Sequence, residues 1–405
     1  MSVPFRPIVS ALFRNRAGAL LVAAQIAIAL AVMANAVCIV KQRVDRIGRP
    51  TGIDVENIFI VSMAGFARQF NYTAMLDEDI KWIGSIPGVL GVTATNTVPL
   101  SGGGSSDYVT LTPTAKSERQ SLVNYFELNE QGADTLGLKL SAGRWFNRTE
   151  VLPPPVTVFD SYSGPTVLTK EYADRLFPNG DALGKNIYGS RGEPLTIIGI
   201  VDHMLSSYLA PNWPADVIYL ARQPVGPNAT YLVRTRPGMR DELMRKVEAE
   251  LGPRNRGRAV NGVRTLSIIK ARSYLTDRNM SIYLVTVTAL LLAISSLGIF
   301  GLATFNVSTR TKQVGTRRAV GARRRDIVAH FLVENWMITT GGVLGGCVLA
   351  LAAGHLVSLE YNLPRLDLYY ILGGVLVMWV VGLAAAWHPS RRAARISPAL
   401  ATRTV

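Results

Sequence analysis

The densest group of ionisable side chains lies between two long apolar segments in the C-terminal half of the 405-residue chain. Between Val307 and Phe331 there is one acid, Asp326, and there are seven cations. The cations are Arg310, Lys312, Arg317, Arg318, Arg323, Arg324 and Arg325. Guanidinium groups pair strongly with carboxylates, so this stretch suits docking onto an acidic rim of another protein. The alternative is that these cations only set membrane topology, because Lys and Arg concentrate in short cytoplasmic loops.

Residues that could form an active site or a metal site are sparse. Asp202 and His203 follow a predicted strand, with Glu193 and Asp216 nearby in sequence. A strand-end turn is favoured over a metal or acid/base site, because the chain has no H-x-x-x-H, C-x-x-C or G-x-S-x-G spacing. We therefore predict a non-catalytic chain that itself binds no cofactor or metal.

Two further features have simple interpretations. The glycine-rich run 101–106 is predicted to be a flexible lead-in rather than a phosphate loop, since no lysine follows at the required offset. Cys38 and Cys347 both lie in apolar segments. The polar region between residues 41 and 278 has no cysteine, so it cannot form a disulfide.

Four apolar segments are long enough to cross a bilayer, for which about 20 residues suffice. The predicted spans are residues 17–40, 280–307, 331–357 and 368–387. Residues 41–278 have a net charge of +4, whereas the rest of the chain, with far fewer residues, contributes +11 of the total of +15. This asymmetry argues against a nucleic-acid partner. It predicts a multi-pass membrane protein with both termini, the loop 308–330 and the tail 388–405 in the cytoplasm.

The N-terminal residues 1–16 are predicted to form a helix in the cytoplasmic membrane interface. A cleaved signal peptide is an alternative, because Ala34-Asn35-Ala36 resembles a cleavage site. Against that alternative, the apolar run is longer than the usual hydrophobic region of a signal peptide.

The region 41–279 contains no further span and is predicted to form one large α+β extracytoplasmic domain between the first two transmembrane helices. A strand-helix-strand pattern (58–63, 73–85, 89–97) near its start recurs near its end (230–235, 240–251, 262–269). These units predict a split domain, 41–98 with 228–279, around an inserted subdomain, 99–227. The polar run 270–279 is expected to extend the second transmembrane helix as a stalk. A short periplasmic loop, 358–367, joins the last two spans.

The third span holds glycines in a doubled small-xxx-small pattern, which allows close helix packing. They are Gly341, Gly342, Gly345 and Gly346. Glu334 and His355 lie near the ends of this span, and we expect their side chains to reach the membrane interface rather than to form a proton relay.

The stretch Arg310 to Ala322, RTKQVGTRRAVGA, resembles the loop between the second and third helices of MacB/FtsX-type ABC transporter permeases. That loop reads approximately E-R-x-x-E-I-G-x-R-R-A-x-G-A, and Thr309 and Gln313 replace its two acids. Gly315 and Gly321 are expected to separate two short helices. The resemblance assigns an ATPase-coupling role to Arg310, Gln313, Gly315, Arg317, Arg318, Ala319, Val320, Gly321 and Ala322.

The resemblance extends over most of the chain. Four segments match the periplasmic motifs of the family in order: Gly143 to Phe146, Leu168 to Pro178, Leu183 to Lys185, and Thr196 to Asp202. The tail, His388 to Ala401, resembles the closing motif P-A-x-R-A-A-R-x-x-P-x-x-A-L.

This resemblance implies a permease subunit without a fused ATPase, since the sequence has no G-x-x-x-x-G-K-[S/T] motif. ATP and Mg²⁺ would then bind to a cytoplasmic ATPase partner. A homo- or heterodimeric permease embedded in the lipid of the inner membrane would transmit motion to the periplasm. It would export a drug, peptide or other substrate through a periplasmic adaptor and an outer-membrane duct. Two alternatives stay open: a lipoprotein-extracting permease, and a non-transporting signal transmitter for a cell-wall hydrolase or an antibiotic response.

Overall fold

The computed structural model describes residues 16–66, 71–113, 121–154, 161–209, 215–224, 230–254, 257–361 and 366–396. Residues 1–15 of the predicted interfacial helix (1–16) and the tail beyond Ile396 lie outside these residues, and Arg16 is the first residue of α2. The chain divides into two compact units. We call Met1–Gly48 with Thr276–Val405 the membrane unit, and Arg49–Leu275 the extramembrane domain.

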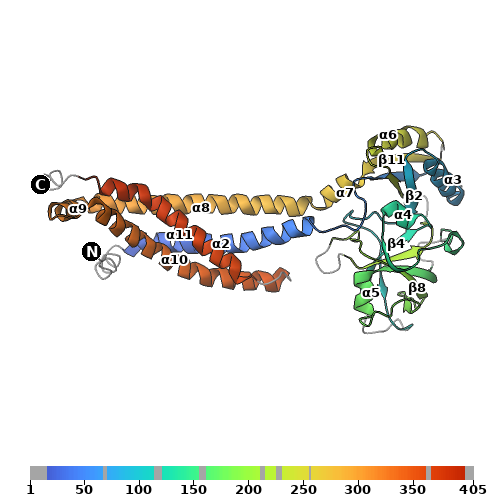
Figure 1. Cartoon of the computed structure of the whole chain (residues 1–405), viewed down its shortest axis with the longest axis horizontal. Helices are drawn as coiled ribbons and strands as arrows, with labels where there is room; N and C mark the ends of the chain where they lie inside the picture. The colour runs from blue at the N-terminus through green and yellow to red at the C-terminus, as the bar shows by residue number, and fades with distance from the viewer. Residues whose placement is uncertain are drawn as a thin grey trace. The chain divides into compact units, whose positions relative to one another are not determined.

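Four helices of the membrane unit are long and apolar enough to cross a bilayer, which confirms the predicted fold class. They are α2 (Arg16–Ile47), α8 (Leu275–Thr309), α10 (Arg324–Tyr361) and α11 (Leu368–Ala393) (Figure 1). The helices are longer than the apolar segments: α2 continues beyond Val40, and α10 begins seven residues before Phe331. Apolar composition marks the part of a helix that lies in lipid, whereas hydrogen bonding and capping decide where the helix ends.

Close packing joins α2 to α10 through small residues. A Cβ atom at Gly342 would lie 2.7 Å from the Ala23 carbonyl oxygen, and one at Gly346 would lie 3.0 Å from the Ala27 carbonyl oxygen. Glycine therefore lets the two backbones approach. Gly345 also faces α2, since a Cβ atom there would lie 3.7 Å from the Ala27 Cβ, whereas a Cβ at Gly341 would meet nothing within 4 Å.

The extramembrane domain contains two sheets. The first has the order β11-β1-β10-β2 and is antiparallel throughout. Its strands come from both ends of the domain, because β1 and β2 lie before residue 96 and β10 and β11 after residue 229. Its strands and helices are β1 (Ile58–Gly65), α3 (Tyr72–Gly84), β2 (Val89–Thr95), β10 (Thr230–Thr235), α6 (Arg240–Leu251) and β11 (Arg258–Thr265).

The second sheet has seven strands in the order β3-β4-β9-β6-β8-β5, with β7 paired to β8. It is mixed, since β4 pairs with β9 and β6 with β8 in parallel. Its strands are β3 (Ser106–Val109), β4 (Ser121–Leu128), β5 (Leu140–Gly143), β6 (Gly164–Thr169), β7 (Asn186–Tyr188), β8 (Pro194–Val201) and β9 (Val217–Ala221). The short helices between them are α4 (Gly132–Leu136), the 3₁₀ turn η1 (Arg148–Glu150) and α5 (Lys170–Leu176).

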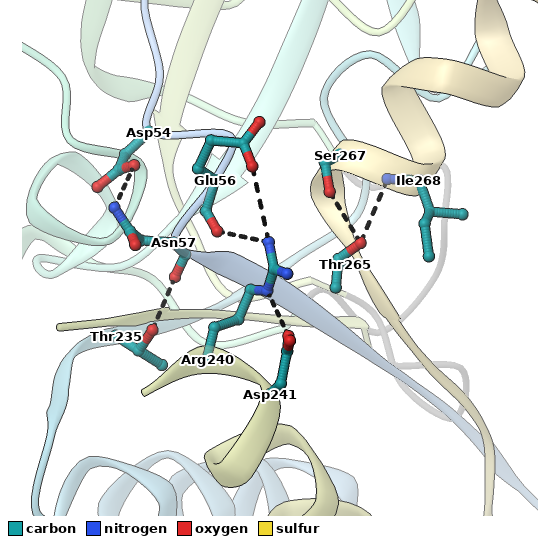
Figure 2. A network of polar contacts seen from close by, with 9 residues as sticks. All are labelled: Asp54, Glu56, Asn57, Thr235, Arg240, Asp241, Thr265, Ser267 and Ile268. Atoms are coloured by element: carbon teal, nitrogen blue, oxygen red, sulfur yellow. Dashed lines mark hydrogen bonds and ion pairs between the residues drawn. The ribbon is translucent and has the colours of Figure 1, made fainter. Parts of the chain in front are cut away.

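A polar network joins the start of β1 to the end of β10 and the start of α6 (Figure 2). Arg240 donates to the Glu56 carbonyl oxygen at 2.6 Å and to the Asp241 carboxylate at 2.8 Å. The Thr235 hydroxyl donates to the Asn57 carbonyl oxygen at 3.1 Å. These bonds fix the loop that enters the first sheet.

The end of β11 differs from the sequence prediction. The strand expected to reach Ile269 ends at Thr265, whose hydroxyl accepts the Ile268 N–H at 3.3 Å and caps helix α7 (Leu266–Ser273) (Figure 2). Tyr274 then separates α7 from α8, so no single helix runs through the predicted stalk. An N-cap bond of this kind outweighs the β-propensity of the isoleucines that follow it.

Two buried ion pairs link distant segments of the extramembrane domain. Asp79 on α3 accepts from Arg258 on β11, with Nη2 to Oδ1 at 2.7 Å, and from the Tyr231 hydroxyl at 2.6 Å. Glu127 on β4 accepts from Arg222 Nε at 2.9 Å. Burial raises the pKa of Glu127, and Arg222 offsets part of that rise. Each carboxylate is neutralised by a partner distant in sequence.

Candidate coupling site

The cationic stretch forms a short helix, α9 (Thr311–Ala319), immediately after α8. Arg310 is its N-cap, and the Val314 N–H donates to the Arg310 carbonyl oxygen at 3.0 Å. Gly321, with φ of 100°, ends the helix by letting the Ala322 N–H reach the Arg317 carbonyl oxygen at 3.1 Å. A positive φ of this size favours glycine, so Gly321 fixes the turn. Gly315, by contrast, lies inside α9, and the expectation that it separates two helices is wrong.

One side of α9 is buried. Val314 belongs to an apolar cluster with residues of α8, α10 and α11, and Gly315 is buried beside it. Ala322 packs partly buried against the same cluster. The cluster also contains Val307, Ile327, Phe331, Ala393 and Ala394.

Arg310 is held by an acid on the next helix. Its Nη1 lies 3.0 Å from Glu334 Oε1 and 3.1 Å from Oε2. Glu334 is 2% exposed, so its carboxylate is enclosed by the protein, and its expected position at the membrane interface stays a prediction. Arg310 and Glu334 are 24 residues apart, and no local spacing in the sequence indicates this pair.

Arg318 is held by the end of α11. Its Nη1 donates to the carbonyl oxygens of Ala394 at 3.2 Å and Ile396 at 2.7 Å. Carbonyl groups at a helix C-terminus lack intrahelical partners and carry partial negative charge, so a guanidinium group is favoured there.

The opposite side of α9, with the turn that follows it, is exposed, and we call it the α9 face. It consists of Lys312, Gln313, Thr316, Arg317, Ala319, Val320 and Gly321. Val320 is 85% exposed, although it is apolar. Arg317 has no hydrogen bond or ion pair with any residue in the described ranges. Arg323, Arg324 and Arg325 beside it are also exposed, and the Asp326 carboxylate accepts the Arg323 N–H at 3.0 Å.

The predicted coupling residues therefore divide into two groups. Arg310, Gly315, Arg318 and Ala322 face the protein, whereas Gln313, Arg317, Ala319, Val320 and Gly321 face outward. An exposed valine within a stretch of exposed cations suits a protein interface, in which an apolar centre is ringed by polar contacts.

The other candidate site of the sequence, around Asp202 and His203, does not form a metal site or an acid/base site among the described residues. His203 Nδ1 contacts the Glu171 carboxylate, and its Nε2 lies 2.9 Å from the Pro50 carbonyl oxygen. Over the part of the chain that the structure describes, no three His, Cys, Asp or Glu side chains are grouped as a metal site would need.

The extramembrane domain contains a cleft of about 780 Å³. It lies between α3 and β2 on one side and α4 and η1 on the other. Gln223 donates to Asp77 across it at 2.9 Å. Its lining mixes acids, cations and apolar side chains, and it contains no arrangement typical of an active site.

Two family models match this chain. Residues 21–250 match the MacB-like periplasmic core domain, and residues 285–398 match the FtsX-like permease C-terminal domain. The first match alone covers more than half of the 405 residues.

Two of the curated relatives are named as export proteins. The macrolide export ATP-binding/permease protein MacB of Neisseria gonorrhoeae is 27% identical over 288 residues, which cover 67% of this chain and 42% of that protein. The pyoverdine export ATP-binding/permease protein PvdT of Pseudomonas syringae pv. tomato is 33% identical over 126 residues, 31% of this chain and 19% of that protein. The chain thus spans less than half the length of these relatives.

Among solved structures, the periplasmic region of MacB from Actinobacillus actinomycetemcomitans aligns with 55% of this chain and 94% of that chain. The sequence identity is 17% and the TM-score 0.34.

Proposed function

The chain belongs to the family of FtsX-like ABC transporter permeases with a MacB-like periplasmic core domain, and we propose that it couples a separate ATPase subunit to movement of that domain. In this proposal ATP and Mg²⁺ bind to the partner ATPase, and this chain performs no catalysis. The permease is multi-pass in the inner membrane, with a periplasmic domain. We further propose that both termini and α9 lie in the cytoplasm, as the positive-inside rule favours.

The observation that carries this proposal is the division of α9 into an anchored side and an exposed side. The α9 face presents Val320 for an apolar cleft and Arg317 and Lys312 for acids at its rim. Approach of two ATPase subunits on binding ATP would push on this face. The anchored side would pass the displacement to the transmembrane helices.

The substrate route is proposed by analogy with the relatives, which are named as macrolide and pyoverdine export proteins. Two copies of this permease, or one copy and a homologous subunit, would drive a drug, peptide or other periplasmic substrate outward. A periplasmic adaptor and an outer-membrane duct would complete the path.

Co-purification from the native membrane in mild detergent tests the ATPase contact. We expect the wild-type chain to recover a soluble Walker-type ATPase, and Arg317→Glu to lose it, because the substitution reverses the charge of an unpaired side chain on the α9 face. Arg236→Glu, the same change at an exposed position of the extramembrane domain, serves as the matched control and is expected to retain the ATPase. Full recovery with Arg317→Glu, or no ATPase with the wild-type chain, would contradict the proposal.

Arg317→Glu is preferable to a double substitution with Arg318. Arg318 holds the end of α11 through two carbonyl oxygens, so its replacement also disturbs packing inside the membrane unit. Loss of ATPase from the double variant would therefore have two explanations.

A further inference from the structure

Helix α9 is covalently continuous with α8, yet its longer-range polar contacts are to α10 and α11. At its N-terminal end Arg310 contacts both carboxylate oxygens of Glu334 on α10. At its C-terminal end Arg318 contacts the carbonyl oxygens at the end of α11. The apolar cluster around Val314 fills the space between these two anchors.

Asn335, the residue after Glu334, connects α10 to α11. Asn335 is 5% exposed, and its Nδ2 donates to the Gly382 carbonyl oxygen of α11 at 2.9 Å. A Cβ atom at Gly382 would lie 2.8 Å from the Thr339 hydroxyl oxygen, so α10 and α11 are tightly packed at this level. A displacement that reaches Glu334 therefore reaches a rigid contact between α10 and α11.

The environment of the pair makes it difficult to break. Glu334 is almost fully buried, and removing one partner of such a pair leaves an uncompensated charge in a poorly solvated site. Buried ion pairs contribute little net stability compared with apolar packing, but they can specify one arrangement over others. The junction between α8 and α9 at Arg310 would otherwise act as a hinge, because Arg310 has non-helical φ and ψ angles of −110° and 17°.

We infer that Arg310 and Glu334 form a positioning pair that makes α9 move with α10, instead of swinging about its junction with α8. Arg318 holds α9 to α11 in the same way at the other end. The role of this pair in coupling rests on the proposed function, because it requires that an ATPase push on the α9 face. Its geometry is independent of any partner.

Distance measurement by pulsed electron spin resonance tests the pair on the full-length chain in nanodiscs. Spin labels are placed at Gln313 on α9 and at exposed Leu344 on α10, with Cys38 and Cys347 replaced by alanine. We expect one narrow distance distribution for the parent chain. Arg310→Ala and Glu334→Ala are each expected to lose the narrow peak, because α9 is released from α10.

The exchanged variant Arg310→Glu with Glu334→Arg should recover the narrow peak, because it restores an ion pair. If the single variants had disrupted the packing in general, the exchange would not restore the peak. Arg324→Ala, which removes an exposed cation nearby, is the matched control and should leave the distribution unchanged. Narrow peaks in both single variants, or no recovery in the exchanged variant, would overturn the inference.

A second measurement separates this inference from the proposed function. In the co-purification experiment, Arg310→Ala is expected to retain the ATPase that Arg317→Glu loses, because Arg310 lies off the α9 face. Loss of the ATPase from Arg310→Ala would assign Arg310 to docking and overturn its separate positioning role. The spin-label experiment needs no ATPase, so it stands whether or not the proposed function does.

Discussion

The extramembrane domain and the α9 region use arginine in opposite ways. In the domain, Arg222 and Arg258 are buried and each pairs with a carboxylate that lies far away in sequence. In the cationic stretch 310–325, five of the seven cations are exposed, and the acid that follows it, Asp326, accepts the Arg323 N–H at the start of α10. The exposed cations are Lys312, Arg317, Arg323, Arg324 and Arg325.

This difference separates a structural role from a docking role. A buried charge requires a partner within the chain, because desolvation is costly. An exposed cluster of like charges gains nothing from its neighbours, and it is free to meet an acidic surface on another protein. Arg310 and Arg318 lie within the cationic stretch but belong to the structural class.

Arg258→Ala should produce the largest effect on stability. It removes the guanidinium that pairs with the buried Asp79 carboxylate on α3, and breaking a buried pair in this way costs about 3–5 kcal/mol. Hydrogen exchange of the full-length chain in detergent should show faster exchange in β10 and β11. Arg254→Ala is the matched control, since Arg254 is exposed and its guanidinium stacks on Trp82 at 4.6 Å. Equal exchange in the two variants would remove the distinction between buried and exposed arginines.

Alkaline pH tests the buried polar groups of the domain. Burial raises the pKa of Tyr162 to about 12, above a value near 10 in the unfolded chain. The hydroxyl accepts from the Ala221 N–H at 3.1 Å and donates to the Pro165 carbonyl oxygen at 2.8 Å. Because the folded pKa is the higher one, this stabilisation is complete below pH 10 and is lost as the pH rises through 12.

The corresponding comparison is between wild type and Tyr162→Phe. The stability advantage of the wild type over the variant should shrink by about 2–3 kcal/mol between pH 9 and 12, as the two-unit pKa difference requires. Denaturant unfolding of both chains across this pH range measures it. A gap that stays constant would show that the Tyr162 hydroxyl is not isolated from solvent.

Glycine substitutions in α10 should have a smaller effect. Gly342→Ala forces a Cβ against the Ala23 carbonyl oxygen, and such overpacking typically costs about 1–3 kcal/mol. Gly341→Ala adds a methyl group in open space, and alanine is the better helix former. Thermal unfolding in one detergent should therefore show a lower midpoint than wild type for Gly342→Ala. The midpoint of Gly341→Ala should not be lowered. Similar midpoints would mean that α2 and α10 can separate.

The sequence was sufficient for features that depend on local composition. Apolar length located the four spanning helices, and period-2 and period-3.6 patterns located β10 and α6 at their observed bounds. Helix ends were missed where caps decide them: Thr265 starts α7 within a predicted strand, and the Asp326 carboxylate lies at the start of α10. The secondary-structure propensity of a single residue does not indicate whether its side chain forms a capping bond.

Within the candidate site, the cationic stretch and its glycines were predicted, but the division of its residues was not. Arg317 and Arg318 are adjacent in sequence, yet one is unpaired on the α9 face and the other contacts α11 76 residues away. Likewise, Gly342 contacts α2 and its neighbour Gly341 does not. These differences follow from the rotation of a helix relative to its neighbours, which only the tertiary structure fixes.

Site-specific photo-crosslinking in native membranes tests the central claim most directly. A photoreactive amino acid is placed at Val320 on the α9 face, and at Val348, a similarly exposed position in the apolar part of α10, as the control. We expect Val320 to crosslink to a soluble ATPase with a Walker motif, and Val348 to give no such product. A Val320 product that contains no ATPase, or the same ATPase product from both positions, would contradict the assignment of the α9 face as the coupling surface.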